Sequence, residues 1–194
     1  MILVYFILLA IPLSFLCGGR LRYMAENPLR LIWLPPLAFA LEAVSPFLRD
    51  RIPFPVSQWL WIAVSLEYAL LFLFCFFNWK RKPVRFIALA CFLNLFVIAW
   101  YGFRMPVAPI VHEFSDMASV VARIQSGELF DYVLVDYGAP FLFLGDALLI
   151  PFVHSGLASI GDLFLAIGVG WLIFQWMRPS PQKRKASVPG RNMA

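Results

Sequence analysis

Charged residues are scarce in this chain. Asp, Glu, Lys and Arg make up 14% of its 194 residues, whereas 62% of the residues are hydrophobic, and the mean hydropathy is +0.80. A soluble domain usually carries about 25% charged residues. A chain of this composition could not cover its surface with polar groups, so it is typical of an integral membrane protein.

Paired cysteines and catalytic motifs are also missing. Cys17, Cys75 and Cys91 all lie in apolar segments, none belongs to a C-x-x-C pair, and their odd number argues against a disulfide framework. No G-x-S-x-G or P-loop motif occurs. The stretch "HEFSD" at 112–116 lacks the second His of H-E-x-x-H, and a zinc site needs three or four converging ligands. The sequence therefore predicts no catalytic residue, no metal site and no cofactor.

Long apolar segments dominate what is present. A membrane helix needs about 20 apolar residues, and five segments bounded by Gly, Pro or charge fit that length, at 1–17, 29–48, 58–78, 86–102 and 156–177. The first has no basic n-region and no A-x-A site, so we expect it to be retained as a span. The sequence predicts an all-α integral membrane protein with five transmembrane helices. Its single membrane-embedded domain covers 1–178, and a flexible basic cytoplasmic tail covers 179–194.

The distribution of Lys and Arg predicts the orientation. The loops after the first and third spans, together with the C-terminal tail, hold 12 of the 16 basic residues. The positive-inside rule then places the N-terminus outside and the C-terminus in the cytoplasm. The basic stretch "QKRKASVPGR" becomes an ordinary cytoplasmic tail next to anionic lipid, so we expect the lipid bilayer as partner and no nucleic acid.

The connection over 103–155 is then extracytoplasmic. Phe114, Met117, Val121 and Ile124 have helical spacing and Gly127 is a C-cap candidate, which predicts a short amphipathic helix at the outer interface. The apolar run over 139–153 is too short to span a membrane and is interrupted by Gly and Pro. It predicts a re-entrant or interfacial half-helix.

Three stretches in this order resemble one family. They are "CGGRL" after the first span, "WYGFRMPV" after the fourth, and "FLGDALL…SIGDLFLAIGVG" leading into the fifth. Over nearly the whole chain the sequence resembles the small bacterial multi-span membrane proteins classed as domain of unknown function 5317. The resemblance implies a multi-pass protein of the bacterial cytoplasmic (inner) membrane, and it implies no activity and no catalytic residue.

Asp162 lies inside the fifth apolar segment, where a charged carboxylate has a high free-energy cost. Ala158, Asp162, Ala166 and Gly170 are spaced by four, so they share one helix face on which small residues allow another helix to approach. Partners at similar depth are Arg104, Asp146 and Glu42. We therefore predict an outer polar cluster of Arg104 with Asp162, Asp146 or Glu42, since an unpaired buried charge is costly. Such a cluster could lock helix packing, bind a ligand, ion or lipid headgroup, or serve proton-coupled function.

Glu67 and Asn94 form a second candidate pair, near the middle of the third and fourth spans. One interpretation is a neutral Glu67 hydrogen-bonded to Asn94, because burial disfavours a charged carboxylate. The other is a proton or cation relay through Glu67.

Three functions remain open from the sequence. The first is a non-catalytic membrane protein that binds a small ligand, ion or lipid headgroup in the outer half of the bundle, with a role as a transport component. The second is a structural or accessory subunit of a larger membrane complex, with other membrane subunits or a second copy as partners. The third is a membrane-embedded lipid-modifying enzyme. Five spans without an internal repeat disfavour a self-sufficient secondary transporter.

Overall fold

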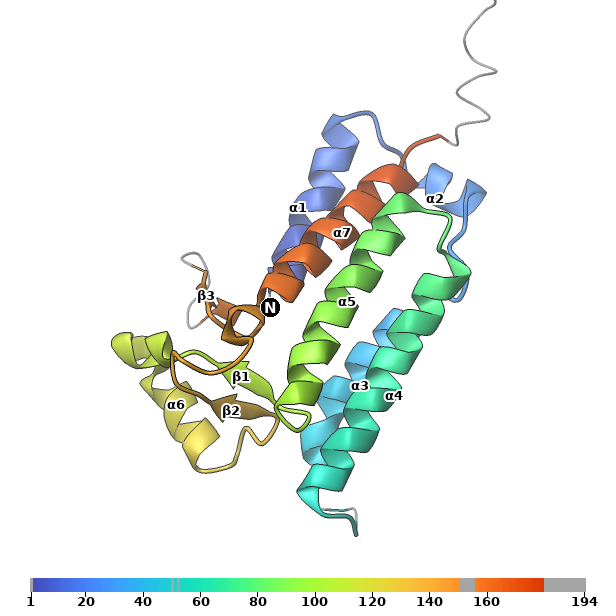
Figure 1. Cartoon of the computed structure of the whole chain (residues 1–194). Coiled ribbons are helices and arrows are strands. Elements are labelled where there is room, and N and C mark those ends of the chain that lie inside the picture. The colour runs from blue at the N-terminus through green and yellow to red at the C-terminus, as the bar shows by residue number, and fades with distance from the viewer. Residues whose placement is uncertain (1, 50, 52, 151–155, 180–194) are drawn as a thin grey trace, which may run out of the picture.

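The structure is a computed structural model that describes residues 2–49, 51, 53–150 and 156–179. Most of these residues are helical (Figure 1). The α-helices are α1 Ile2–Leu16, α2 Arg22–Glu26, α3 Leu34–Arg49, α4 Val56–Phe77, α5 Lys82–Trp100, α6 Ala118–Gln125 and α7 Ile160–Trp176. The predicted basic tail lies, apart from Pro179, outside the described residues.

Each of the five predicted apolar segments overlaps with one long helix, namely α1, α3, α4, α5 or α7, and α4 and α5 begin before their predicted segments. In the described part of the chain, α4 and α5 are long and apolar enough to cross a membrane, and α1 and α7 are shorter apolar helices. α3 is a helix of 16 residues that includes Glu42 and ends at Arg49. The predicted helices are thus present, and two of them have the length and composition of a membrane span.

Two of these helices begin later than predicted. α3 begins at Leu34 rather than at residue 29, because Leu31 adopts a left-handed conformation with φ 52° and Asn78 holds the preceding turn through both backbone groups of Arg30, at 2.9 and 2.8 Å. α7 begins at Ile160 because Ser159 caps the helix. The residues before Ser159 form a short strand instead.

α5 lies at the centre of the bundle. It packs against α7 on one side and α4 on the other, α7 packs against α1, and α4 packs against α3. Gly168 allows the close contact of α7 with α5, since a Cβ at this position would lie 2.8 Å from Ile87 Cγ1. The main apolar core consists of buried side chains from α3, α4, α5 and α7, including Ala38, Leu71, Cys75, Val84, Cys91 and Leu172.

The connection after α5 forms a small α/β unit at one end of the bundle (Figure 1). Strand β1, Met105–Val107, pairs in parallel with β2, Tyr132–Leu134. The predicted amphipathic helix over 112–127 is shorter in the structure: two 3₁₀ turns, Pro109–Glu113 and Ser115–Met117, precede α6. Its apolar residues do not lie free at an interface, because they pack with the strands in a second core of Val107, Val111, Met117, Val121 and Ile124. Gly127 ends the helix as predicted, with φ +74°.

The predicted half-helix over 139–153 is wrong for the described residues. A 3₁₀ turn, Leu142–Leu144, leads to strand β3, Leu148–Leu149, which pairs antiparallel with β4, Leu157–Ala158. Asp146 also joins the first strand pair, since its backbone N–H donates to Pro106 at 2.9 Å and its carbonyl accepts from Ala108 at 3.0 Å. Pairing with other segments satisfies the backbone here in place of a helical ladder.

The outer faces of the helices carry large exposed apolar side chains. They include Leu8, Leu9 and Leu16 of α1, Phe47 of α3, Trp61 and Phe76 of α4, and Phe92 and Trp100 of α5. The end of the bundle opposite the α/β unit contains the C-terminal ends of α1 and α7, α2, and the α4–α5 connection (Figure 1). The basic residues Arg20, Arg22, Arg30, Lys80, Arg81, Lys82 and Arg178 lie in these segments or in the connections next to them.

Candidate functional site

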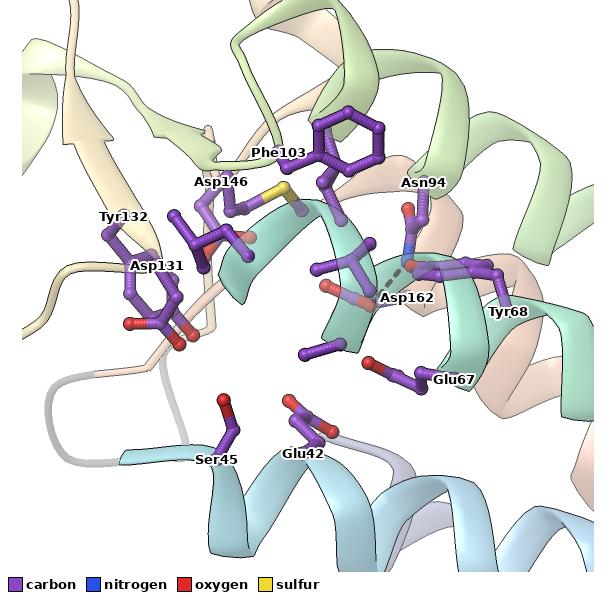
Figure 2. Close-up of a pocket in the computed structure, with 15 residues that line it drawn as sticks. Glu42, Ser45, Glu67, Tyr68, Asn94, Phe103, Asp131, Tyr132, Asp146 and Asp162 are labelled. Atoms are coloured by element: carbon purple, nitrogen blue, oxygen red, sulfur yellow. Dashed lines mark hydrogen bonds between the residues drawn. The ribbon is translucent and has the colours of Figure 1, made fainter. Parts of the chain in front are cut away.

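A cavity lies where the helices meet the α/β unit. Its two parts have volumes of about 150 Å³ and 660 Å³. They share seven lining residues from α3, α4, α5, α7, β2 and the loop before β3, namely Glu42, Glu67, Tyr68, Asn94, Tyr132, Asp146 and Asp162. Figure 2 shows these side chains arranged around a common space. A volume of about 300–1,000 Å³ is typical of small-molecule sites.

The smaller part is an acidic chamber. Five carboxyl groups line it, from Glu42, Glu67, Asp131, Asp146 and Asp162, and each comes from a different segment of the chain. No Lys, Arg or His is among the described residues that line either part. The chamber therefore concentrates negative charge that described cationic side chains do not neutralise.

Asp162 is held by the start of α7. Its carboxylate and Ser159 form a capping box: Ser159 Oγ accepts from the Asp162 backbone N–H at 2.8 Å, and the Ser159 N–H donates to Asp162 Oδ2 at 3.0 Å. Asn94 on α5 completes the network by donating from Nδ2 to Asp162 Oδ1 at 2.9 Å and accepting from the Ser159 hydroxyl at 3.0 Å. The carboxylate is tolerated because it satisfies backbone donors at a helix N-terminus.

Gly161 makes this network possible. A Cβ at Gly161 would overlap with the side-chain amide of Asn94, so any other residue would push α7 away from α5. The sequence had suggested that Asp162 lies well inside the fifth helix. In the structure it is the third residue of α7 and lies at the start of the helix.

Tyr68 is the most buried of the polar aromatic side chains in the cavity. Its side chain extends from α4 toward Asp162 and Asn94 (Figure 2), and the residue is 7% exposed. Within the described residues, its hydroxyl has no hydrogen-bond partner. Tyr68 lines both parts of the cavity, so this group is available to something bound there.

Burial changes the acid–base properties of the groups from the α/β unit. It raises the pKa of the Asp146 carboxyl to about 7, and the neighbouring Asp162 carboxylate adds to the rise. Burial also raises the pKa of Asp131. The pKa of the Tyr132 hydroxyl is raised by burial and by Asp146 and Asp131. Shifts of this kind are found where carboxyl groups share a poorly solvated space.

The predicted cluster with Arg104 is not formed. The residues on either side of Arg104, Phe103 and Met105, line the chamber, whereas Arg104 is not among its lining residues. No hydrogen bond or ion pair in the described chain joins Arg104 to Asp162, Asp146 or Glu42. The three acidic members do line one cavity, although the predicted cation does not.

The predicted pair of Glu67 and Asn94 is also rearranged. Both side chains line the cavity, but Asn94 donates its hydrogen bond to Asp162 rather than to Glu67. Glu67 makes no hydrogen bond with any residue that the structure describes.

Tyr68, Asp131 and Tyr132 were missed from the sequence. Tyr68 follows Glu67 within an apolar helix, and a polar aromatic beside a mid-helix carboxyl was a usable signal. Asp131 and Tyr132 reach the chamber only because β2 pairs with β1, with Tyr132 opposite Met105. No local pattern predicts that pairing.

The carboxyl groups surround the chamber rather than converge on one point. Among the described residues, no group of three or more His, Cys, Asp or Glu side chains could hold a metal ion.

A model of DUF5317, a family of unknown function, matches residues 26–174. The chain belongs to this family. All seven residues shared by the two parts of the cavity fall within the matched segment, as does the whole lining of the smaller part, whereas Leu3, Val4 and Ile7 of the larger part precede it. The comparisons with curated proteins and with solved structures gave no match.

Proposed function

We propose that this DUF5317 protein is a multi-pass protein of the bacterial cytoplasmic membrane that binds a small ligand, ion or lipid headgroup in the outer half of its bundle. In this proposal α1, α3, α4, α5 and α7 cross the membrane. The N-terminus is outside and the C-terminus is in the cytoplasm, and the ligand-binding role is that of a transport component.

Two observations support the membrane topology. Large apolar side chains are exposed along the helices, which suits contact with lipid and not with water. The basic residues of the α1–α3 and α4–α5 connections belong to one end of the bundle, opposite the α/β unit. The positive-inside rule assigns that basic end to the cytoplasm.

The acidic chamber is the observation that carries the ligand-binding proposal. Its walls come from four helices and the α/β unit, and the polar groups of Glu42, Glu67 and Tyr68 make no hydrogen bonds within the described residues. Ionisable groups at membrane depth are rare and mark ligand or ion sites. A cavity lined by polar groups that lack hydrogen-bond partners is the arrangement expected of a binding site.

Native mass spectrometry of the protein extracted gently from its own membrane tests the proposal. We expect a reproducible small added mass on the parent protein, reduced in Glu67→Gln. The Asp136→Asn variant is the control, since Asp136 is exposed and lies outside the lining of the cavity. A parent protein that carries no added mass would contradict the proposal.

An exposed aromatic stripe favours a second candidate, an accessory subunit of a larger complex. Phe92, Phe96 and Trp100 lie exposed along α5, and Phe141 of the α/β unit extends the stripe at 5.0 Å from Phe96 and 4.9 Å from Trp100 between ring centroids. Such a stripe suits a partner helix as well as lipid. Co-purifying protein subunits in the same experiment, released by Phe96→Ala, would favour this candidate.

A further inference from the structure

The charge in the acidic chamber calls for a positively charged occupant. Five carboxyl groups face a space that no described Lys, Arg or His lines, and unpaired carboxylates are costly in a poorly solvated site. The hydroxyl of Tyr68, on a side chain more than nine-tenths buried, points into the same space without a partner. A bound ligand with a cationic group and hydrogen-bonding capacity would satisfy both features.

The shape of the chamber favours an organic cation over a metal ion. No group of three or more ligating side chains converges among the described residues, so the spacing of the carboxyl groups suits a cation larger than a metal ion. The rings of Tyr68, Phe103 and Tyr132 also line the chamber, and aromatic faces attract ammonium groups. A phosphate group is disfavoured because it would meet five carboxyl groups and no described Lys, Arg or His.

The larger part of the cavity continues from the chamber as an apolar cleft. On one side it is lined by α1 and on the other by α3, through Leu3, Val4, Ile7, Pro35, Pro36 and Phe39. These two helices pack on different partners, α1 on α7 and α3 on α4. The cleft thus gives an apolar path along the helices that ends at the carboxylates.

We propose that the cavity binds an amphiphilic cation, with an ammonium head group in the acidic chamber and a hydrocarbon tail in the cleft between α1 and α3. This inference rests on the proposed ligand-binding function and names the chemical class of the ligand. Glu67, Glu42 and Asp146 provide the counter-charge, Tyr68 faces the head group, and Phe39 contacts the tail.

The test is native mass spectrometry of the full-length protein in a neutral detergent, titrated with decyltrimethylammonium. We expect saturable binding of one molecule. Asp146→Asn and Glu67→Gln should each weaken binding on the order of tenfold or more, as removal of a charge from a buried ion pair does. Asp136→Asn should bind like the parent protein, and all three variants should remain monodisperse with melting temperatures near that of the parent.

Two further probes examine the head and the tail separately. Decanoate has the same tail length with an anionic head and should not bind, whereas hexyltrimethylammonium should bind more weakly than the decyl probe, by about fourfold for each methylene group that no longer enters the cleft. Binding of decanoate at least as tight as that of the cation would overturn the charge assignment. Equal binding of tetramethylammonium and the decyl probe would overturn the tail assignment.

The outcomes also separate this inference from the proposed function. If the native protein carries a small added mass but decyltrimethylammonium neither binds nor displaces it, the cavity has a ligand of another class and only this inference fails. If no added mass is present and no probe of either charge binds, both fail.

Discussion

The two ends of the bundle differ in how their polar side chains are hydrogen-bonded. At the basic end, Asn78 bonds to the backbone of Arg30 and Phe74, Arg81 donates to the carbonyl and side chain of Asn27, and Trp176 donates to the carbonyl of Asn27. At the acidic end, Glu42, Glu67 and Tyr68 have no such partners within the described chain. The comparison teaches that side-chain hydrogen bonds join the segments of the first end, where Ser14 Oγ is a buried exception without a partner, whereas three polar side chains of the second end make none, as in binding sites.

One hydrogen-bond network at the acidic end stabilises the fold, as the hydrogen bonds at the basic end do. Asp162, Ser159 and Asn94 satisfy one another across the contact of α5 and α7. Asp162 therefore has two roles, because it caps a helix and also contributes charge to the chamber. Substitutions at the two ends should separate stability from binding.

The largest expected effect is at the basic end. Asn78→Ala should lower the free energy of unfolding by about 3 kcal/mol, because three hydrogen bonds from a buried side chain are lost at about 1 kcal/mol each. Reversible unfolding in mixed detergent micelles measures the change. Binding of decyltrimethylammonium by the folded protein should be unchanged.

The control for this variant is Gln58→Ala, at an exposed position near the start of α4, which should change stability by less than about 0.5 kcal/mol. If Asn78→Ala were as stable as the parent protein, the stabilising network at the basic end would have to be abandoned.

The next largest expected effect on stability is at Asp162, which both caps α7 and contributes charge to the chamber. Asp162→Ala should lower the free energy of unfolding by about 2 kcal/mol, because the capping box and the bond from Asn94 are lost. It should also weaken binding of the cationic probe. Unfolding and native mass spectrometry on the same preparation measure the two effects.

Ser159→Ala separates these effects, since it removes the cap hydroxyl and leaves the charge of Asp162 in place. It should lower stability by about 1 kcal/mol and bind the probe within about twofold of the parent protein. Loss of binding in Ser159→Ala equal to that in Asp162→Ala would show that the charge of Asp162 is not what the ligand recognises.

Much of the helical architecture was predictable from the sequence, because long apolar segments bounded by Gly, Pro and charge have few alternatives to a helix. The acidic members of the site were also predictable, since Glu42, Glu67 and Asp162 stand out against apolar neighbours. The residues that these acidic groups contact in the structure were not predictable. Asn94 bonds to Asp162 because Gly161 lets α5 and α7 approach, and Asp131 enters the chamber through a parallel strand pair. Both depend on contacts between distant segments, which one sequence does not reveal.

The smallest expected effect on stability is the pH dependence that Asp146 contributes. Its pKa is raised to about 7 from an ordinary value of 3.8, so between these values the folded state binds more protons than the unfolded state. Stability therefore falls as pH rises through this window and is constant above it. The titratable groups that line the chamber with Asp146 are Asp162, Asp131, Glu42, Glu67, Tyr68 and Tyr132, and the Asp162 carboxylate adds to the rise in the pKa of Asp146.

Between pH 5 and pH 8 the parent protein should lose on the order of 1 kcal/mol relative to Asp146→Asn, because burial of the carboxyl is partial and the remaining water in the chamber screens part of its charge. Melting curves in neutral detergent at the two pH values measure this difference, and Asp136→Asn should follow the parent. Affinity for the cationic probe should change in the opposite direction, rising with pH as Asp146 becomes charged. If stability and affinity both rose with pH, Asp146 would be a stabilising residue like those at the basic end, and the contrast between the two ends would not hold at this position.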